Sequence, residues 1–161
     1  AAPRKGSMLV ISGPSGSGKT TICKRLLEDP RVRFSVSATT RAPRPGEVDG
    51  RDYHFLSREK FRALMYEGAF IEHADVYGNM YGTLRKPMEE ALARGEVYLL
   101  EIDVQGANQL QALGEPGLYV FVAPPDFETL RKGFPVSRHT SRLEGDAHMH
   151  GVTIEVMKKK A

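Results

Sequence analysis

Gly13-Pro14-Ser15-Gly16-Ser17-Gly18-Lys19-Thr20 is the stretch that decides the fold of this chain of 161 residues. It matches the pattern G-x-x-x-x-G-K-[ST], whose glycines let successive backbone N–H groups turn inward onto phosphate oxygens. Lys19 supplies a cation for the β- and γ-phosphates, and the Thr20 hydroxyl is able to ligate Mg²⁺. The motif therefore predicts a nucleotide-binding loop formed by all eight residues, but it does not identify the phosphate acceptor.

The segments around this loop predict the fold class. Residues 8–12 form a short apolar run typical of a buried strand, and the apolar spacing over residues 20–28 predicts a helix. Two further apolar runs, at 97–102 and 118–122, alternate with helices expected at 87–94 and 104–113. This alternation predicts an α/β fold of the P-loop NTPase type, a parallel sheet with helices on both faces.

The segment between about residues 34 and 83 has a different pattern. Short strands are expected at 34–37, 53–56, 70–76 and 81–83, around one helix that Ser57 caps. Residues 41–52 are rich in arginine, proline and glycine and predict a loop. We expect one domain in three parts: a core (about 7–33 and 84–132), an inserted subdomain (about 34–83) and an unassigned segment (133–161).

Composition excludes several classes of protein. The net charge of +3 is too small to indicate a nucleic-acid partner. No apolar run approaches the ~18 residues of a membrane span, so no membrane partner is expected. The single cysteine, Cys23, excludes an internal disulfide and fits a cytoplasmic location. The oligomeric state, monomer or homodimer, stays open.

Five separate motifs follow the loop. They are FSVSATTRAPRPGEVDGRDY at 34–53, FIE at 70–72, GNMYGT at 78–83, LEIDVQG at 100–106 and APP at 123–125. Together with the loop they resemble guanylate kinases, in the order in which that family carries them, over about residues 8–130. After about Lys132 the chain does not match the family's arginine-rich lid and adenine-binding region. The resemblance implies transfer of a phosphoryl group from ATP, with Mg²⁺, to GMP.

The resemblance implies four residues at the phosphate of GMP: Arg41, Arg44, Tyr53 and Tyr81. The two arginines lie three residues apart on a constrained loop, and their guanidinium groups are suited to fork onto phosphate oxygens. The tyrosines are able to donate phenolic hydrogen bonds to the same group. The alternatives are a solvated loop for the arginines and half-buried sheet positions for the tyrosines.

The resemblance also implies how guanine is recognised. Glu72 corresponds to the carboxylate that accepts the N1–H and N2–H groups, and adenine would leave that carboxylate unpaired. Ser37, Thr83 and Asp103 correspond to further guanine contacts, while Glu101 is expected near the metal or the acceptor ribose. The alternatives are a surface charge for Glu72 and, for Asp103, a magnesium partner beside Thr20 at a strand end.

Catalysis is expected to depend on positioning and charge neutralisation. The expected catalytic residues are Lys19, Arg41, Arg44 and, from the unmatched segment, Arg138. A rival hypothesis is a non-catalytic guanylate-kinase-like domain that binds phosphopeptides, although such domains typically lose the phosphate loop that is complete here. A P-loop kinase with another small phosphorylated acceptor is a second alternative.

Overall fold

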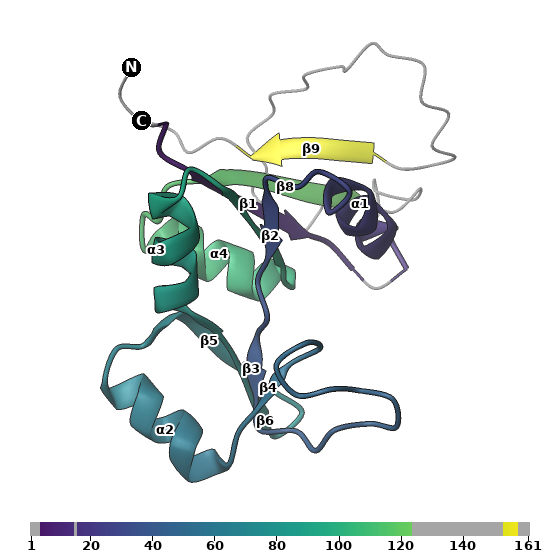
Figure 1. Cartoon of the computed structure of the whole chain (residues 1–161). Helices are drawn as coiled ribbons and strands as arrows, with labels where there is room; N and C mark the ends of the chain where they lie inside the picture. The colour runs from purple at the N-terminus through teal and green to yellow at the C-terminus, as the bar shows by residue number, and fades with distance from the viewer. Residues whose placement is uncertain (1–3, 15, 124–152, 158–161) are drawn as a thin grey trace.

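The computed structural model describes residues 4–14, 16–123 and 153–157, which form two sheets and four helices (Figure 1). The main sheet has the strand order β2-β7-β1-β8-β9, and the second sheet has the order β4-β3-β6-β5. The strands are β1 (Ser7–Ser12), β2 (Val32–Phe34), β3 (Ala38–Thr39), β4 (His54–Phe55), β5 (Phe70–Val76), β6 (Asn79–Leu84), β7 (Val97–Glu101), β8 (Leu118–Ala123) and β9 (Thr153–Met157). The helices are α1 (Lys19–Leu26), α2 (Arg58–Tyr66), α3 (Arg85–Ala93) and α4 (Val104–Ala112).

The main sheet confirms the predicted α/β fold class. β2, β7, β1 and β8 run parallel, and β1 at the centre alternates its apolar side chains between the two faces. Met8 and Val10 belong to a core that includes residues of α3 and α4, whereas Leu9 and Ile11 pack in a second core with α1. Helices therefore cover both faces of the sheet, with α1 on one side and α3 and α4 on the other (Figure 1).

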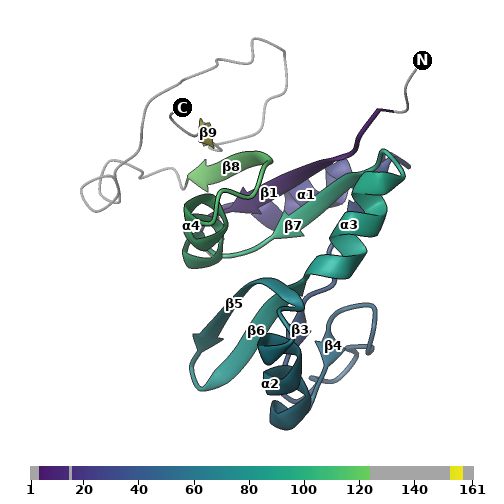
Figure 2. The same ribbon diagram turned by 90° about the vertical axis from the view of Figure 1, so that its left-hand side faces the viewer.

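The second sheet has its own apolar core against α2. Phe61 of α2 stacks on Phe70 of β5 with ring centroids 4.5 Å apart, and Ala38 completes the buried cluster. Ser57 caps α2 as predicted, since its hydroxyl accepts a hydrogen bond from the Lys60 backbone N–H at 3.1 Å. In Figure 2 this sheet and α2 lie below the main sheet, and β5 runs beneath α4.

The structure corrects one predicted strand. Residues 34–37 are not a single strand, because β2 pairs with β7 and ends at Phe34, while β3 joins β6 in the second sheet from Ala38 onward. The intervening residues 35–37 carry the chain from one sheet to the other. The sequence showed the alternating pattern but not the change of partner.

Other elements differ at their ends. α1 ends at Leu26, two residues before the predicted end, and β6 begins at Asn79 rather than Tyr81. α3 begins at Arg85, so Pro87 is its third residue, where the missing N–H would have no helical partner. β9, which pairs antiparallel with β8, was not predicted and adds an antiparallel edge to the parallel sheet.

Among the described residues, no helix has both the length and the apolar content needed to cross a membrane.

Candidate functional site

The phosphate loop follows β1 directly and ends at the start of α1. Gly13, Gly16 and Gly18 all have positive φ angles, of 153°, 78° and 95°, which residues with a Cβ rarely adopt. At Gly13 a Cβ would also overlap the backbone carbonyl of Val122 in β8. The glycines of the motif are thus required by the path of the backbone, as the sequence predicts, while Ser15 lies outside the described residues.

Two side chains of the loop already have partners. The Lys19 ammonium donates to the Gly13 carbonyl at 2.7 Å. The end of the Lys19 side chain therefore contacts the first residue of the same loop. The Thr20 hydroxyl donates to Oε1 of Glu101, at the end of β7, at 2.7 Å. The sequence predicts Thr20 and Asp103 as metal ligands, whereas the carboxylate in contact with Thr20 is that of Glu101.

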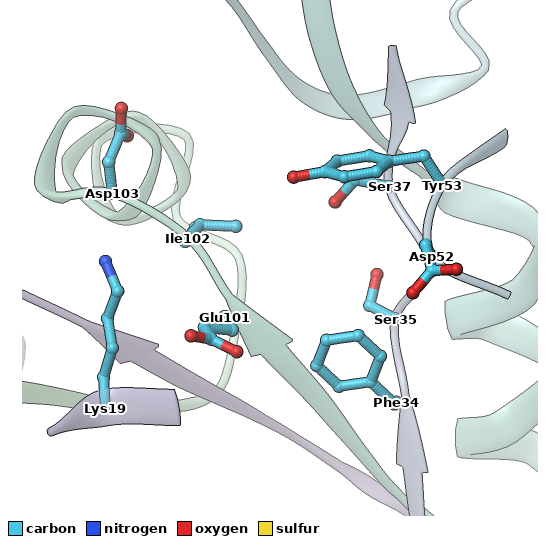
Figure 3. A pocket seen from close by; sticks show the side chains of 9 residues that line it. All are labelled: Lys19, Phe34, Ser35, Ser37, Asp52, Tyr53, Glu101, Ile102 and Asp103. Atoms are coloured by element: carbon cyan, nitrogen blue, oxygen red, sulfur yellow. The ribbon is translucent and has the colours of Figure 1, made fainter. Parts of the chain in front are cut away.

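A pocket of about 280 Å³ lies beside the loop and opens between the two sheets (Figure 3). Figure 3 shows Lys19, Glu101 and Asp103 on one wall, with Ser37 and Tyr53 opposite them. The pocket therefore brings together five of the predicted site residues from distant parts of the chain. Its remaining lining residues, which the sequence did not single out, are Phe34, Ser35, Asp52 and Ile102.

Arg41 lies next to the tyrosines that were predicted to share its ligand. Its guanidinium carbon is 5.2 Å from the centroid of the Tyr53 ring and 5.9 Å from that of Phe55. The Tyr53 ring in turn meets Tyr81 edge-on, at 6.1 Å between centroids. The residues assigned to phosphate recognition thus form one contiguous cluster, except for Arg44.

Glu47 is the partner that sequence reasoning missed. Its carboxylate accepts from both terminal nitrogens of Arg41, at 2.8 and 3.0 Å, and from the backbone N–H of Arg44 at 2.7 Å. These bonds, chiefly those from the Arg41 side chain, lower the pKa of Glu47 to about 2. The signal was available, because an acid six residues after Arg41 in a tight loop is able to reach its guanidinium.

Arg44 differs from Arg41 in its environment. The Arg44 side chain is exposed whereas that of Arg41 is mostly buried, and only the backbone of Arg44 is held by Glu47. Neither arginine lines the pocket. Glycines at positive φ, Gly46 and Gly50, give the loop its turns, and the Asp49 carboxylate accepts from the Phe55 N–H at 2.9 Å. The loop backbone is thus internally braced while the Arg44 side chain remains exposed.

Glu72 is a buried carboxylate on β5. Its side chain is 7% exposed, and Oε1 accepts a 2.6 Å hydrogen bond from the Thr83 hydroxyl on β6. Burial raises the pKa of Glu72, and the charge of Asp103 raises it further, whereas the bond from Thr83 acts in the opposite direction. The alternative of a surface charge at Glu72 is therefore wrong.

Asp103 lies at the start of α4, where its Oδ1 accepts from the Gly106 N–H at 2.8 Å and caps the helix. A Cβ placed on Gly106 would come 3.1 Å from Glu72 Oε2 and 3.3 Å from Asp103 Oδ1, so the two carboxylates flank the same glycine. The structure thus brings Asp103 toward Glu72. Arg138 lies outside the described residues.

A family model for guanylate kinase matches residues 5–155, which extends the resemblance beyond residue 130. The chain belongs to the guanylate kinase family. The guanylate kinase of Clostridioides difficile is 50% identical over 129 residues, which are 80% of this chain and 63% of that protein. The guanylate kinase of Cereibacter sphaeroides is 52% identical over 130 residues, 79% of this chain and 62% of that protein.

A crystal structure of guanylate kinase from Anaplasma phagocytophilum superposes with a TM-score of 0.64 at 43% identity, covering 80% of this chain and 65% of that chain. The chain thus spans less than two thirds of the length of the guanylate kinases that it matches. Family membership supports the overall arrangement of the loop and both sheets.

Proposed function

We propose that the chain binds GMP and MgATP and transfers the γ-phosphoryl group of ATP to GMP, giving GDP and ADP. The observation that carries this proposal is the pocket shared by Lys19 of the phosphate loop and by Ser37 and Tyr53 at the edge of the second sheet. Lys19, which would bind the phosphates of ATP, and Ser37 and Tyr53, which would bind GMP, line the same pocket. Direct transfer requires the two substrates to lie side by side in this way. We further propose that the second sheet and α2 form the acceptor subdomain, within a cytoplasmic enzyme.

The acceptor phosphate is assigned to the cluster around Arg41. A guanidinium carries five N–H groups. In Arg41 two donate to Glu47 and one to the Ala42 carbonyl, so that the Nε–H and one Nη2–H remain on one edge. Tyr81 is a further hydrogen-bond partner of this guanidinium, and a bound phosphate would share or displace that contact. That edge is able to bind two phosphate oxygens, with Tyr53 and Tyr81 as neighbouring donors. Arg44 would add its exposed cation to the same phosphate.

Guanine is assigned to Glu72. The Thr83 hydroxyl occupies only one of the roughly four lone-pair positions of a carboxylate, so acceptors remain for N1–H and N2–H of guanine. Adenine has no N1–H and would leave this buried charge unpaired, which is a strong basis for rejection. Ser37 and Asp103, which line the pocket, are proposed as further contacts to the base.

The donor phosphates are assigned to the loop at residues 13–20. Its N–H groups and the start of α1 favour negative charge, and Lys19 would exchange its contact with the Gly13 carbonyl for the β- and γ-phosphates. The Thr20 hydroxyl and the Glu101 carboxylate are hard oxygen donors that fit Mg²⁺. Mg²⁺ would neutralise charge on the transferred phosphoryl group.

No cluster of three or more histidine, cysteine or acidic side chains able to hold a metal occurs in the described part of the chain.

In this proposal catalysis comes from alignment and charge neutralisation. Lys19 and the arginines offset charge on the reacting phosphates, and the pocket walls exclude competing water. The reaction needs no covalent intermediate on the protein. The rival hypothesis of a phosphopeptide-binding domain uses the same arginine cluster, but it gives no role to the intact loop at Gly13, Gly16 and Gly18.

Calorimetric titration with GMP, guanosine and AMP tests the proposed acceptor site. We expect GMP to bind more tightly than guanosine, because only GMP carries the phosphate for Arg41, and AMP to bind weakly. In the variant Glu72→Gln the preference for GMP over AMP should fall at least tenfold, while MgATP affinity stays unchanged. An unchanged preference would refute the assignment of Glu72.

A further inference from the structure

β5 lies beside α4 (Figure 2), and three consecutive residues of β5 approach this helix in three different ways. Ile71 is 1% exposed and packs in the core cluster that contains Ala107 and Leu110. Glu72 points its Oε2 toward Gly106, and the His73 backbone N–H donates to Gln109 Oε1 at 2.9 Å. The strand that carries Glu72, the proposed guanine-binding carboxylate, therefore packs against α4, a helix that covers the main sheet.

Gln109 binds a backbone group that the second sheet leaves free. β5 is the edge strand of that sheet, so some of its N–H groups face away from β6. Gln109 accepts one of them, at the residue after Glu72, across 36 positions of sequence. The bond fixes the backbone of β5 next to a register shift that lies between Phe70 and Glu72.

Gly106 is the second residue of α4 that lies close to β5. It lies inside α4, where glycine is less favourable than alanine, and its φ is not positive. The Gly106 backbone N–H donates to the Asp103 carboxylate, and any residue other than proline would donate the same bond. Its remaining distinction is the lack of a Cβ, which would meet Glu72 Oε2 at 3.1 Å, so that the carboxylate would have to shift by a few tenths of an ångström.

We propose that Gly106 and Gln109 are positioning residues that set the place of the Glu72 carboxylate and through it the selectivity for guanine. The inference rests on the proposed function, because it assumes that Glu72 binds N1–H and N2–H of GMP. Two parallel hydrogen bonds to one carboxylate tolerate little displacement. A shift of Glu72 is therefore expected to weaken recognition of the base before it affects the phosphate loop.

The test compares GMP with inosine monophosphate, which lacks the amino group at C2 and therefore one of the two donors to Glu72. We would measure both dissociation constants by calorimetry in the parent, Gly106→Ala and Gln109→Met. Asn108→Ala is the matched control, since Asn108 is an exposed side chain on the same helix. Gln109→Met keeps the length of the side chain but removes the acceptor for His73.

We expect the preference for GMP over inosine monophosphate to fall about tenfold in both variants, the cost of weakening one hydrogen bond to a charged group. The KM for MgATP of both variants should equal that of the parent. The Asn108→Ala variant should keep the parent's preference for GMP over inosine monophosphate. Combining Gln109→Met with Glu72→Gln should cause no further loss of preference beyond Glu72→Gln alone, because Gln109 acts through Glu72.

Three outcomes are informative. A parent that does not bind GMP refutes the proposed function and this inference together. A parent that prefers GMP, with folded variants that keep the same preference, overturns the inference alone, even where their unfolding temperatures fall. If Gly106→Ala does not fold, Gln109→Met decides the question by itself.

Discussion

Arg41 is the residue whose role changes most between sequence and structure. The sequence predicts a cation free to bind phosphate, but the side chain is only 13% exposed and is bound by Glu47. The hydrogen bonds that Arg41 donates to Glu47 raise the pKa of Arg41, with a smaller contribution from Tyr81, so its charge is permanent. Glu47 also accepts from the Arg44 backbone N–H, which favours a residue that braces the loop and orients Arg41 over one that occupies the place of the phosphate.

Replacing Glu47 by glutamine tests this role. Glu47→Gln removes one of the two oxygens that hold the guanidinium, and we expect the KM for GMP to rise about tenfold with the KM for MgATP unchanged. Because the pKa of Glu47 is about 2, the pair persists down to strongly acidic pH and should not contribute to the activity profile between pH 5 and 8. Steady-state kinetics of the parent, Glu47→Gln and the exposed control Glu59→Gln provide the measurement. Tighter GMP binding in Glu47→Gln would show that Glu47 competes with the phosphate.

Glu72 links function to stability. Burial raises its pKa, so the folded state binds a proton more readily than the unfolded state, and the ionised carboxylate reduces stability at neutral pH. We expect Glu72→Gln to have a higher unfolding temperature than the parent at pH 7. The difference should shrink as the pH falls through the raised pKa, because the parent then gains the missing proton. Scanning calorimetry across pH 4.5 to 8 measures this, and a lower unfolding temperature at pH 7 would contradict it.

At the scale of elements, the sequence predicted what depends on local pattern. The apolar run of β1, the glycines of the loop and the hydroxyl cap of α2 are read directly from neighbouring residues. The division of residues 34–37 between two sheets was not predictable in this way, since it depends on which strand each half pairs with. The contact between β5 and α4 was not predictable for the same reason, because Gln109 and His73 are distant in sequence and meet only in the folded chain.

The cap of α2 provides a prediction at this scale. Ser57→Ala removes the acceptor for the Lys60 N–H, and we expect the free energy of unfolding to fall by about 1 kcal/mol, a typical value for the loss of an N-cap. The affinity for MgATP should not change, because the phosphate loop lies in the other sheet. Urea unfolding of the parent, Ser57→Ala and Ser57→Asp measures the effect. Ser57→Asp keeps a capping oxygen and should restore the stability, and its failure to do so would argue against the cap.

At the scale of the whole molecule, the two halves of the site come from different sheets. The phosphate loop follows β1 of the main sheet, whereas Glu72 and Thr83 lie on strands of the second sheet. Arg41 and Glu47 lie in the loop between β3 and β4 of that second sheet. The phosphate loop and the five motifs that follow it predicted both halves but not their junction, at which the pocket lies. Family membership and the structure agree on this arrangement.

The most direct measurement is MgATP-dependent formation of GDP from GMP by the purified chain, followed by chromatography of the nucleotides. We predict that GDP and ADP form in equal amounts, that omission of GMP or Mg²⁺ abolishes both, and that Lys19→Ala reduces the rate at least a hundredfold, an effect of about 3 kcal/mol or more. Absence of turnover, together with binding of a phosphopeptide that Arg41→Ala abolishes, would contradict the account and assign the chain to the non-catalytic guanylate-kinase-like domains.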